Sequence, residues 1–348
     1  MSQTTITPDS SLPAETTGLA SDAHRRWGVP RCGYHSNAIM LWIGLRFLRL
    51  AYFFVWFAAA YFFLFVPKAR RASLRYLALI HARETRGPFR RGWQTYRHMV
   101  EFGFLLLDRA VMLAQPRHGY AIQCEGLEHL AVASRRNAAG EQPGVLLLSA
   151  HFGNAEIAAP YMRRMGLTRP IHIVMYQDAR QGTEKFHANH RRMLDDVHII
   201  STTNPLSAGV KIMAALKRGE VVAMRADRTL NSRGIPATFL GQHIDVPTGP
   251  FLAAVLSGVP IVHIYTCRLG FRRYLCRISP VHRYGDDQPG TATGALTRNE
   301  RLARAAQDYT DYLEKILREF PYQWSNFYDY FHEQRAADDK TVDEKFSR

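Results

Sequence analysis

The sequence predicts an α/β protein in which a mostly parallel sheet is flanked by helices and is preceded by one N-terminal hydrophobic membrane helix. Three observations predict this fold. Short apolar runs alternate with amphipathic stretches through the middle of the chain, an uncharged apolar segment lies near the N-terminus, and a long amphipathic stretch lies near the C-terminus. With 348 residues, 47% of them hydrophobic, the chain can bury one substantial core.

The apolar runs in the middle of the chain have the length of buried strands, and stretches with helical periodicity separate them. Strands that alternate with helices in this way form βαβ units, which produce a parallel sheet. Ligands of such a sheet bind at the carboxyl ends of its strands. The predicted strands are 144–149, 171–175, 197–200, 220–224 and 260–266, and the predicted helices between them are 155–164, 182–194, 205–216 and 251–256.

Further helical stretches frame the predicted sheet. Residues 73–115 have a helical pattern that a Gly-Pro pair interrupts, and residues 299–320 place apolar side chains along one helix face. Near the end of the sheet, Leu269 and Gly270 separate two β-like runs. These runs predict an antiparallel hairpin at one edge of the sheet.

Residues 50–66 form an apolar segment of 17 residues without a charge. This length is at the lower limit of the roughly 17–25 residues that cross a bilayer, so the segment could span the membrane or lie in its interface. Lys68, Arg70 and Arg71 follow directly, and the positive-inside rule then places the rest of the chain in the cytoplasm. A buried core helix is the alternative, but the run of aromatic residues leaves the segment without a polar face.

Composition divides the chain into four parts. Residues 1–37 are rich in Ser, Thr and Pro and are predicted to form a mobile polar tail. Residues 38–72 contain the apolar segment and are predicted to be a membrane anchor. Residues 73–335 contain all of the predicted strands and form the main domain, and residues 336–348 form a second polar tail.

The net charge of +15 favours an anionic partner, which could be nucleic acid, an acidic lipid surface or an acidic carrier protein. The sequence has no zinc-finger spacing and no aromatic RNA-binding motif, so we do not expect nucleic acid to be the partner. The four cysteines lack metal-type spacing, and His187 and His190 have no third ligand nearby in the sequence. We therefore expect neither a metal ion nor an organic cofactor.

His151 carries the sharpest chemical signal, because it directly follows the predicted strand 144–149 in the segment His-Phe-Gly-Asn-Ala-Glu. It should therefore lie at the carboxyl edge of the sheet. Glu156, five residues later, could fold back onto the imidazole, fix its tautomer and stabilise the imidazolium. The pair would then act as a general base on a substrate hydroxyl. The alternative is a surface histidine that is satisfied by its neighbours.

The neighbours of His151 suit the same chemistry. Gly153 would let a substrate carbonyl approach the backbone, Asn154 is a good helix N-cap, and free N–H groups at the helix start could stabilise an oxyanion. Another polar group, formed by Arg225, Asp227 and Arg228, follows the predicted strand 220–224. An arginine here could bind a phosphate or carboxylate in a bidentate manner, and the alternative is a surface salt bridge between Arg228 and Asp227.

These segments resemble a known family. His-Phe-Gly-Asn-Ala-Glu matches the His-x4-Asp/Glu motif of the lysophospholipid acyltransferase superfamily, in the form typical of its lipid A biosynthesis lauroyl/myristoyl acyltransferase branch. Residues 216–228 resemble the second motif block of the family, 239–250 its FxG…TG segment, and 322–330 the aromatic tail of a subgroup. The resemblance implies a glycerolipid acyltransferase-like fold, with His151 as the base and Glu156 as its orienting residue.

The resemblance also implies roles for other positions. Asp227 and Arg228 would bind the acceptor or the carrier, and Thr248 and Gly249 would admit substrate, with Thr248 capping the helix that follows. Ala155 departs from the tryptophan that is common in the family, and the Ala-Asp-Arg block departs from many lipid A enzymes. Relatives with the Asp-Arg pair and the aromatic tail look more like acyltransferases of other glycolipid or polyene-lipid pathways than like lipid A enzymes.

The sequence therefore predicts a membrane-associated O-acyltransferase at the cytoplasmic face of a bacterial inner membrane. It would move a fatty-acyl group, such as a polyene-acyl group, from an acyl carrier protein (ACP) thioester to a lipid or glycolipid hydroxyl. One alternative is a thioesterase or lipid hydrolase that uses the same histidine and glutamate. A second alternative is a basic membrane scaffold without catalytic activity.

Overall fold

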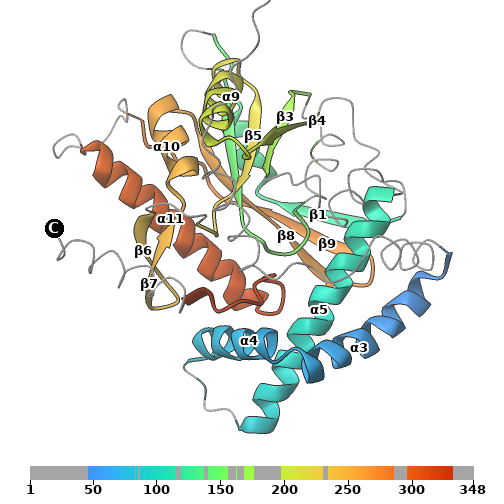
Figure 1. The fold of residues 1–348 in the computed structure, drawn as a ribbon. Coiled ribbons are helices and arrows are strands. Elements are labelled where there is room, and N and C mark those ends of the chain that lie inside the picture. Colours follow the sequence, from blue (N-terminus) through green and yellow to red (C-terminus); the bar gives the residue numbers. More distant parts are fainter. Residues whose placement is uncertain are drawn as a thin grey trace, which may run out of the picture.

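The central part of the molecule is an α/β sandwich with a sheet between helices, and three helices near the N-terminus lie along one side of it (Figure 1). This structure is a computed structural model. It describes residues 46–331 apart from 83, 85–86, 115–118, 137–139, 156–161, 163–167, 176–196, 230–233 and 286–295.

The central sheet has seven strands in the order β1-β9-β8-β2-β5-β3-β4. Neighbouring strands are parallel, except that β8 and β9 form an antiparallel hairpin. The predicted mostly parallel sheet is therefore confirmed, and all five predicted strands are present. The strands are β1 (Ala121–Glu125), β2 (Val145–Ser149), β3 (Ile171–Met175), β4 (Val197–Ser201), β5 (Val221–Arg225), β8 (Ile261–Gly270) and β9 (Arg273–Ile278).

Side chains of β2 alternate between the two faces of the sheet, as they must in a strand. Leu146 and Leu148 belong to one buried cluster with residues of α9, α10 and α11, whereas Val145 and Leu147 belong to another with residues of α6. Both faces of β2 are therefore buried, which explains why its sequence is apolar throughout. The helices are α6 (Leu127–Ala133), α9 (Pro205–Lys217), α10 (Thr248–Ser257) and α11 (Arg298–Glu319).

Three of the predicted helices are confirmed as α9, α10 and α11. The predicted helix 155–164 lies largely outside the described residues, and 182–194 lies wholly outside them. The predicted edge position of the β8–β9 hairpin is wrong, because β1 pairs with the outer side of β9. β1 was not predicted because the sequence Ala-Ile-Gln-Cys-Glu mixes polar and apolar residues and does not form an apolar run.

A second, two-stranded sheet was also not predicted. It consists of β6 (Ile235–Phe239) and β7 (Gln242–Val246), which pair antiparallel. Leu240 and Gly241 connect them with positive φ angles of 52° and 73°. This is the backbone conformation that a two-residue hairpin loop favours. This small sheet contacts α11, and its apolar side chains belong to the main core.

The three N-terminal helices are α3 (Leu48–Phe65), α4 (Pro67–Ile80) and α5 (Pro88–Ala114). By length and composition, α3 is the helix among the described residues that could cross a membrane. The predicted apolar N-terminal helix is therefore confirmed. The Gly-Pro pair separates α4 from α5, as expected, and both helices pack against the body of the molecule (Figure 1).

Candidate active site

β2 and β5 end side by side, and each is followed by a polar side chain. Their parallel register pairs Ser149 of β2 with Arg225 of β5, and His151 and Asp227 each lie two residues further along the chain. The N–H of Ala226 donates to the carbonyl oxygen of Ser149 at 3.0 Å, which keeps the two chains together beyond the strands. His151 and Asp227 therefore face each other at the carboxyl edge of the sheet, where parallel sheets bind their ligands.

The two side chains form a hydrogen-bonded pair. Nδ1 of His151 lies 2.8 Å from Oδ1 of Asp227, and the backbone N–H of His151 donates to Oδ2 at 3.0 Å. The indole N–H of Trp324 also donates to Oδ2, at 3.1 Å. The Asp227 side chain is only 1% exposed, so these three hydrogen bonds replace the water that a buried carboxylate has lost.

Burial, together with the neighbouring Arg228, favours a neutral histidine beside an ionised aspartate. Burial lowers the pKa of His151 to about 4, Arg228 lowers it as well, and Asp227 opposes both effects. Burial acts to raise the pKa of Asp227, but His151, its hydrogen bonds and Arg228 outweigh burial and hold that pKa well below its usual range. An ionised carboxylate can only accept hydrogen bonds, so Nδ1 carries the proton of the imidazole and Nε2 presents a lone pair.

The aromatic segment near the C-terminus lies beside the loop that carries His151. Trp324 and Phe152 form an isolated antiparallel bridge, in which the N–H of Gly153 donates to Gln323 at 2.9 Å and the N–H of Ser325 donates to the His151 carbonyl at 2.7 Å. The Trp324 side chain is 1% exposed and belongs to the main core. The segment therefore finishes the core and supports the histidine loop at the same time.

Gly153 makes a tight turn of this loop against β8. Its φ is +54°, and a Cβ atom at this position would lie 1.9 Å from the carbonyl oxygen of Thr266. That carbonyl accepts the N–H of Asn154 at 3.1 Å, and the Asn154 side chain is buried. The N–H groups of His151, Gly153 and Asn154 all donate to protein acceptors. They are therefore not available for an oxyanion, and the predicted helix start that follows lies outside the described residues.

Two arginines flank Asp227 in the sequence. Arg225 is the last residue of β5, and Arg228 places a guanidinium nitrogen 2.6 Å from the carbonyl oxygen of Ser325. The guanidinium carbon of Arg228 also lies 5.4 Å from the centre of the Tyr328 ring. Arg228 is thus held against the C-terminal segment, close enough to His151 to influence its pKa. Acceptor binding by Arg225, Asp227 and Arg228 stays a prediction.

Thr248, Gly249 and Glu156 are the remaining residues that were predicted to belong to the site. Thr248 and Gly249 begin α10, but its N-cap is Pro247 and no side chain caps the helix, so the predicted capping role of Thr248 is wrong. Pro247 precedes Thr248 in an extended conformation, which makes Thr248 the first residue inside the helix. Substrate binding by Thr248 and Gly249 stays a prediction. Glu156 lies outside the described residues, so its orienting role also stays a prediction.

Sequence reasoning did not find the contacts of Asp227 with His151 and Trp324. A signal for the first contact was present, because both residues follow the ends of apolar strands by the same short distance. Its use requires knowing that β2 and β5 are neighbours, although they are separated in the chain by β3 and β4. The contact with Trp324 spans 97 positions of sequence and depends on how the C-terminal segment folds back.

A buried carboxylate that orients a histidine at the carboxyl edge of an α/β sheet is an arrangement that can support general-base chemistry. The bacterial lipid A biosynthesis acyltransferase family matches residues 37–332, which is most of the chain. The protein belongs to this family and is therefore an acyltransferase of the lipid A type. No curated protein was found to match the chain.

Proposed function

We propose that this acyltransferase moves a fatty-acyl group from an ACP thioester to a lipid or glycolipid hydroxyl, with His151 as the general base. The observation that carries this proposal is the hydrogen bond of 2.8 Å between His151 Nδ1 and the buried carboxylate of Asp227. This hydrogen bond leaves Nε2 of His151 as the ring nitrogen that can accept a proton. Because burial lowers the pKa of His151 to about 4, the ring is ready to act as a base at neutral pH.

In the proposed reaction, Nε2 of His151 removes the proton of the acceptor hydroxyl while the oxygen attacks the thioester carbonyl. The new C–O bond forms a tetrahedral intermediate, whose collapse breaks the C–S bond. The leaving thiolate then takes the proton from the imidazolium. The products are an ester and a free thiol, and His151 returns to its neutral form. The ionised carboxylate of Asp227 stabilises the imidazolium between the two proton transfers.

We assign the orienting role to Asp227 because it accepts a hydrogen bond from Nδ1. Glu156 would then be a second acidic residue, which we propose acts on the substrate and not on Nδ1. Arg225 and Arg228 supply positive charge for a phosphate or carboxylate of the acceptor or of the carrier. Gly153, Asn154, Thr248 and Gly249 complete the proposed substrate-binding set.

The charge of the chain and the apolar helix α3 support a location of the protein at the cytoplasmic face of a bacterial inner membrane. The net charge of +15 attracts anionic lipid and an acidic carrier protein, and α3 presents apolar side chains outside the core. In this proposal residues 38–72 are the membrane anchor and residues 73–335 are the acyltransferase domain. A polyene-acyl group and a glycolipid acceptor are the finer alternatives that the sequence resemblance suggests.

The experiment that tests this function compares wild type with His151→Ala in membranes that are supplied with acyl-ACP and a total lipid extract. Mass spectrometry should find a lipid that is heavier by one acyl unit with wild type only. His282→Ala is a matched control, because His282 is also a partly exposed histidine but packs against His263, away from Asp227. Equal lipid products from wild type and His151→Ala would contradict the proposal. Release of free fatty acid without acylated lipid would instead show a hydrolase.

A further inference from the structure

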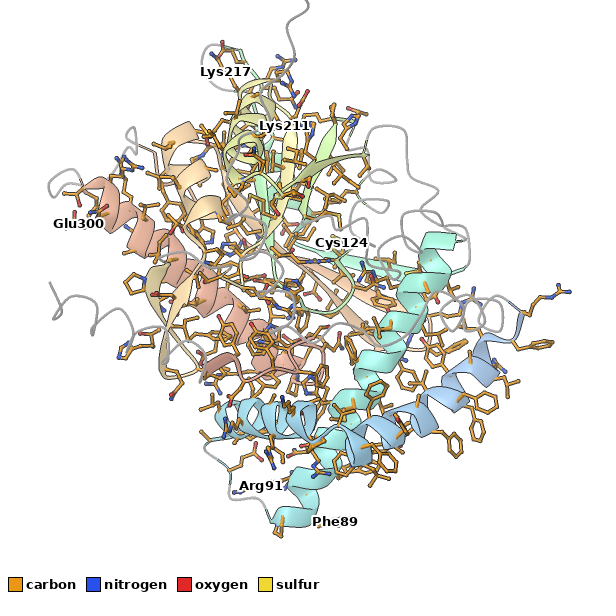
Figure 2. The ribbon with its side chains drawn as sticks, in the orientation of Figure 1. Phe89, Arg91, Cys124, Lys211, Lys217 and Glu300 are labelled. Carbon is orange, nitrogen blue, oxygen red and sulfur yellow. The ribbon has the colours of Figure 1, made fainter. Side chains whose placement is uncertain are left out.

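One stripe of α3 packs against the protein, and the rest of the helix is bare apolar surface. The buried residues recur every three or four positions, from Leu48 to Ala59, and form a single stripe. Side chains along the remainder of α3 point away from the molecule (Figure 2). Six of these are large apolar residues that are each more than half exposed: Phe53, Phe54, Phe57, Tyr61, Leu64 and Phe65.

Both ends of α3 are fastened to the same body. Near its start, the hydroxyl of Tyr52 donates to Asp108 of α5 at 2.5 Å. Near its end, the Phe63 ring lies 6.0 Å from the ring of Tyr96 in α5, and the Phe63 carbonyl accepts a hydrogen bond of 3.0 Å from Arg70 in α4. The helix therefore runs antiparallel to α5 and contacts the protein near both of its ends.

The opposite side of α5 packs on the α/β domain. The ring of Phe102 lies 4.9 Å from that of Phe327, and Leu105 is buried against Tyr274 of β9. α5 also carries charged residues, among them Arg97 and Glu101, within the length that α3 covers. If α3 crossed the bilayer in this arrangement, α5 and the domain that packs on it would enter the lipid with α3, and charged side chains inside the hydrocarbon are costly.

Separation of α3 from α5 would also be costly. Asp108 is fully buried and accepts hydrogen bonds from three tyrosines, one of which is Tyr52 of α3. Loss of α3 would remove one of these donors and expose the packed stripe. A buried carboxylate that loses a hydrogen-bond donor is destabilised, and the lost apolar burial adds to this cost. The packed position of α3 is therefore favoured over a detached helix.

Positive charge lies at both ends of α3. Arg46 and Arg49 mark its beginning, and Lys68 and Arg71 follow its end, and all four are exposed. A helix that spans the membrane would place one of these pairs on the outer side, against the positive-inside rule. A helix that lies in the membrane plane brings both pairs to the anionic headgroups of one leaflet, where each positive charge is attracted.

The turn of the β8–β9 hairpin extends the same surface. Phe271, in this turn, is 39% exposed and its ring lies 5.1 Å from that of Tyr52. The guanidinium of Arg49 lies 5.9 Å from the centre of the Phe271 ring. The turn thus adds an apolar side chain to the beginning of α3, beside one of the flanking cations. An apolar helix face with aromatic residues and flanking cations is typical of a helix in the membrane interface.

We infer that α3 lies in the plane of the membrane, with its outer face in the acyl region of one leaflet and its flanking cations on anionic lipid headgroups. This inference rests on the membrane association in the proposed function and goes beyond it by excluding a transmembrane path for α3. The partner of this surface is a bilayer that contains anionic lipid. Both ends of the helix then lie on the side of the membrane that carries the catalytic domain.

Cysteine labelling in membrane vesicles tests this inference. The full-length protein with Cys32→Ser and Cys124→Ser receives one new cysteine at a time, at Arg46 before α3, at Lys68 after α3, or at Leu206 of α9 as a reporter of the catalytic domain. Leu206 is 81% exposed, whereas the native Cys267 and Cys276 are buried. A membrane-impermeant maleimide is then added to inverted vesicles and, separately, to spheroplasts.

We expect Arg46→Cys, Lys68→Cys and Leu206→Cys to react in the same preparation and to be protected in the other. Reaction of Arg46→Cys from the opposite side would show that α3 spans the membrane and would overturn the inference while leaving membrane association intact. Failure of both end positions to react without detergent would also overturn it, because it places these ends inside the hydrocarbon. Absence of the protein from the membrane fraction would contradict membrane association itself.

Discussion

The carboxylate of Asp227 holds His151 at two points, because Oδ1 lies 2.8 Å from the ring Nδ1 and Oδ2 accepts the backbone N–H at 3.0 Å. One side chain therefore fixes both the rotation of the imidazole and the position of the loop that carries it. This double contact defines which nitrogen faces the substrate, and it makes the effect of changing Asp227 predictable.

Asp227→Asn should lower the rate of acyl transfer by about 10²–10⁴-fold, since it removes the charge that fixes the tautomer and stabilises the imidazolium. The measurement is single-turnover transfer from acyl-ACP by purified protein, with circular dichroism to check folding. Glu156→Gln is the comparison. If Glu156→Gln abolishes turnover while Asp227→Asn retains near-normal rates, Glu156 and not Asp227 orients the histidine.

Trp324→Phe should reduce kcat about 10–100-fold with little change in KM, because the indole N–H donates to Asp227 at 3.1 Å and hydrogen bonds to charged groups contribute about 1.5–3 kcal/mol. Tyr76→Phe is a matched control. Its ring lies 4.9 Å from Trp324, and its hydroxyl bonds the Pro321 carbonyl away from the pair. Steady-state kinetics of both variants at equal folded concentration provide the comparison. Equal effects on kcat would mean that Trp324 acts only through packing.

Gly153→Ala should destabilise the protein by more than about 2 kcal/mol and abolish activity, because the added Cβ would lie 1.9 Å from the Thr266 carbonyl oxygen at a φ of +54°. Gly209→Ala is the control in α9, where an added Cβ meets no atom within 4 Å. That change should stabilise the helix by about 0.5–1 kcal/mol. Chemical denaturation of both variants measures the difference, and a Gly153→Ala protein of wild-type stability would contradict the close approach.

The sheet and its principal helices were predictable because their signals are local. Apolar runs such as 144–149 are buried on both sheet faces, and the stripe on 299–320 is the buried face of α11. β1 was not predictable in this way, because its polar residues face solvent and only pairing with β9 makes it a strand. The same limit applies to β6, whose Pro236 argues against a strand in isolation.

The candidate site shows the same division between local and distant signals. His151 could be found from its position after a buried strand, because one segment contains the whole signal. The relation of Asp227 to His151 depends on the order of strands in the sheet, and that of Trp324 depends on the folded C-terminal segment. The acid that sequence reasoning chose, Glu156, is the one nearest in the chain, whereas the carboxylate seen on the ring is 76 positions away.

The protein should lose stability as the pH falls from about 6.5 to about 4. Burial lowers the pKa of His98 and of His151 to about 4 and that of His263 to about 3. Between the folded and unfolded pKa values the unfolded chain binds more protons, so acid favours unfolding. Each histidine should contribute at most about 2 kcal/mol of this loss at pH 5.

Thermal unfolding of wild type at pH 7.5 and pH 5 measures this loss. His263→Asn should reduce the difference between the two pH values, because the His263 ring is fully buried and, within the described part of the chain, neither of its nitrogens has a hydrogen-bond partner. A Tm that is the same at both pH values would contradict the prediction.

The antiparallel bridge between Phe152 and Trp324 has a consequence for folding during synthesis of the chain. During synthesis His151 leaves the ribosome before Trp324. A growing chain therefore carries His151 without the C-terminal segment that supports its loop. We therefore expect activity only after the C-terminal segment has emerged and folded back onto this loop. An enzyme truncated before residue 322 should therefore be inert even if its sheet assembles.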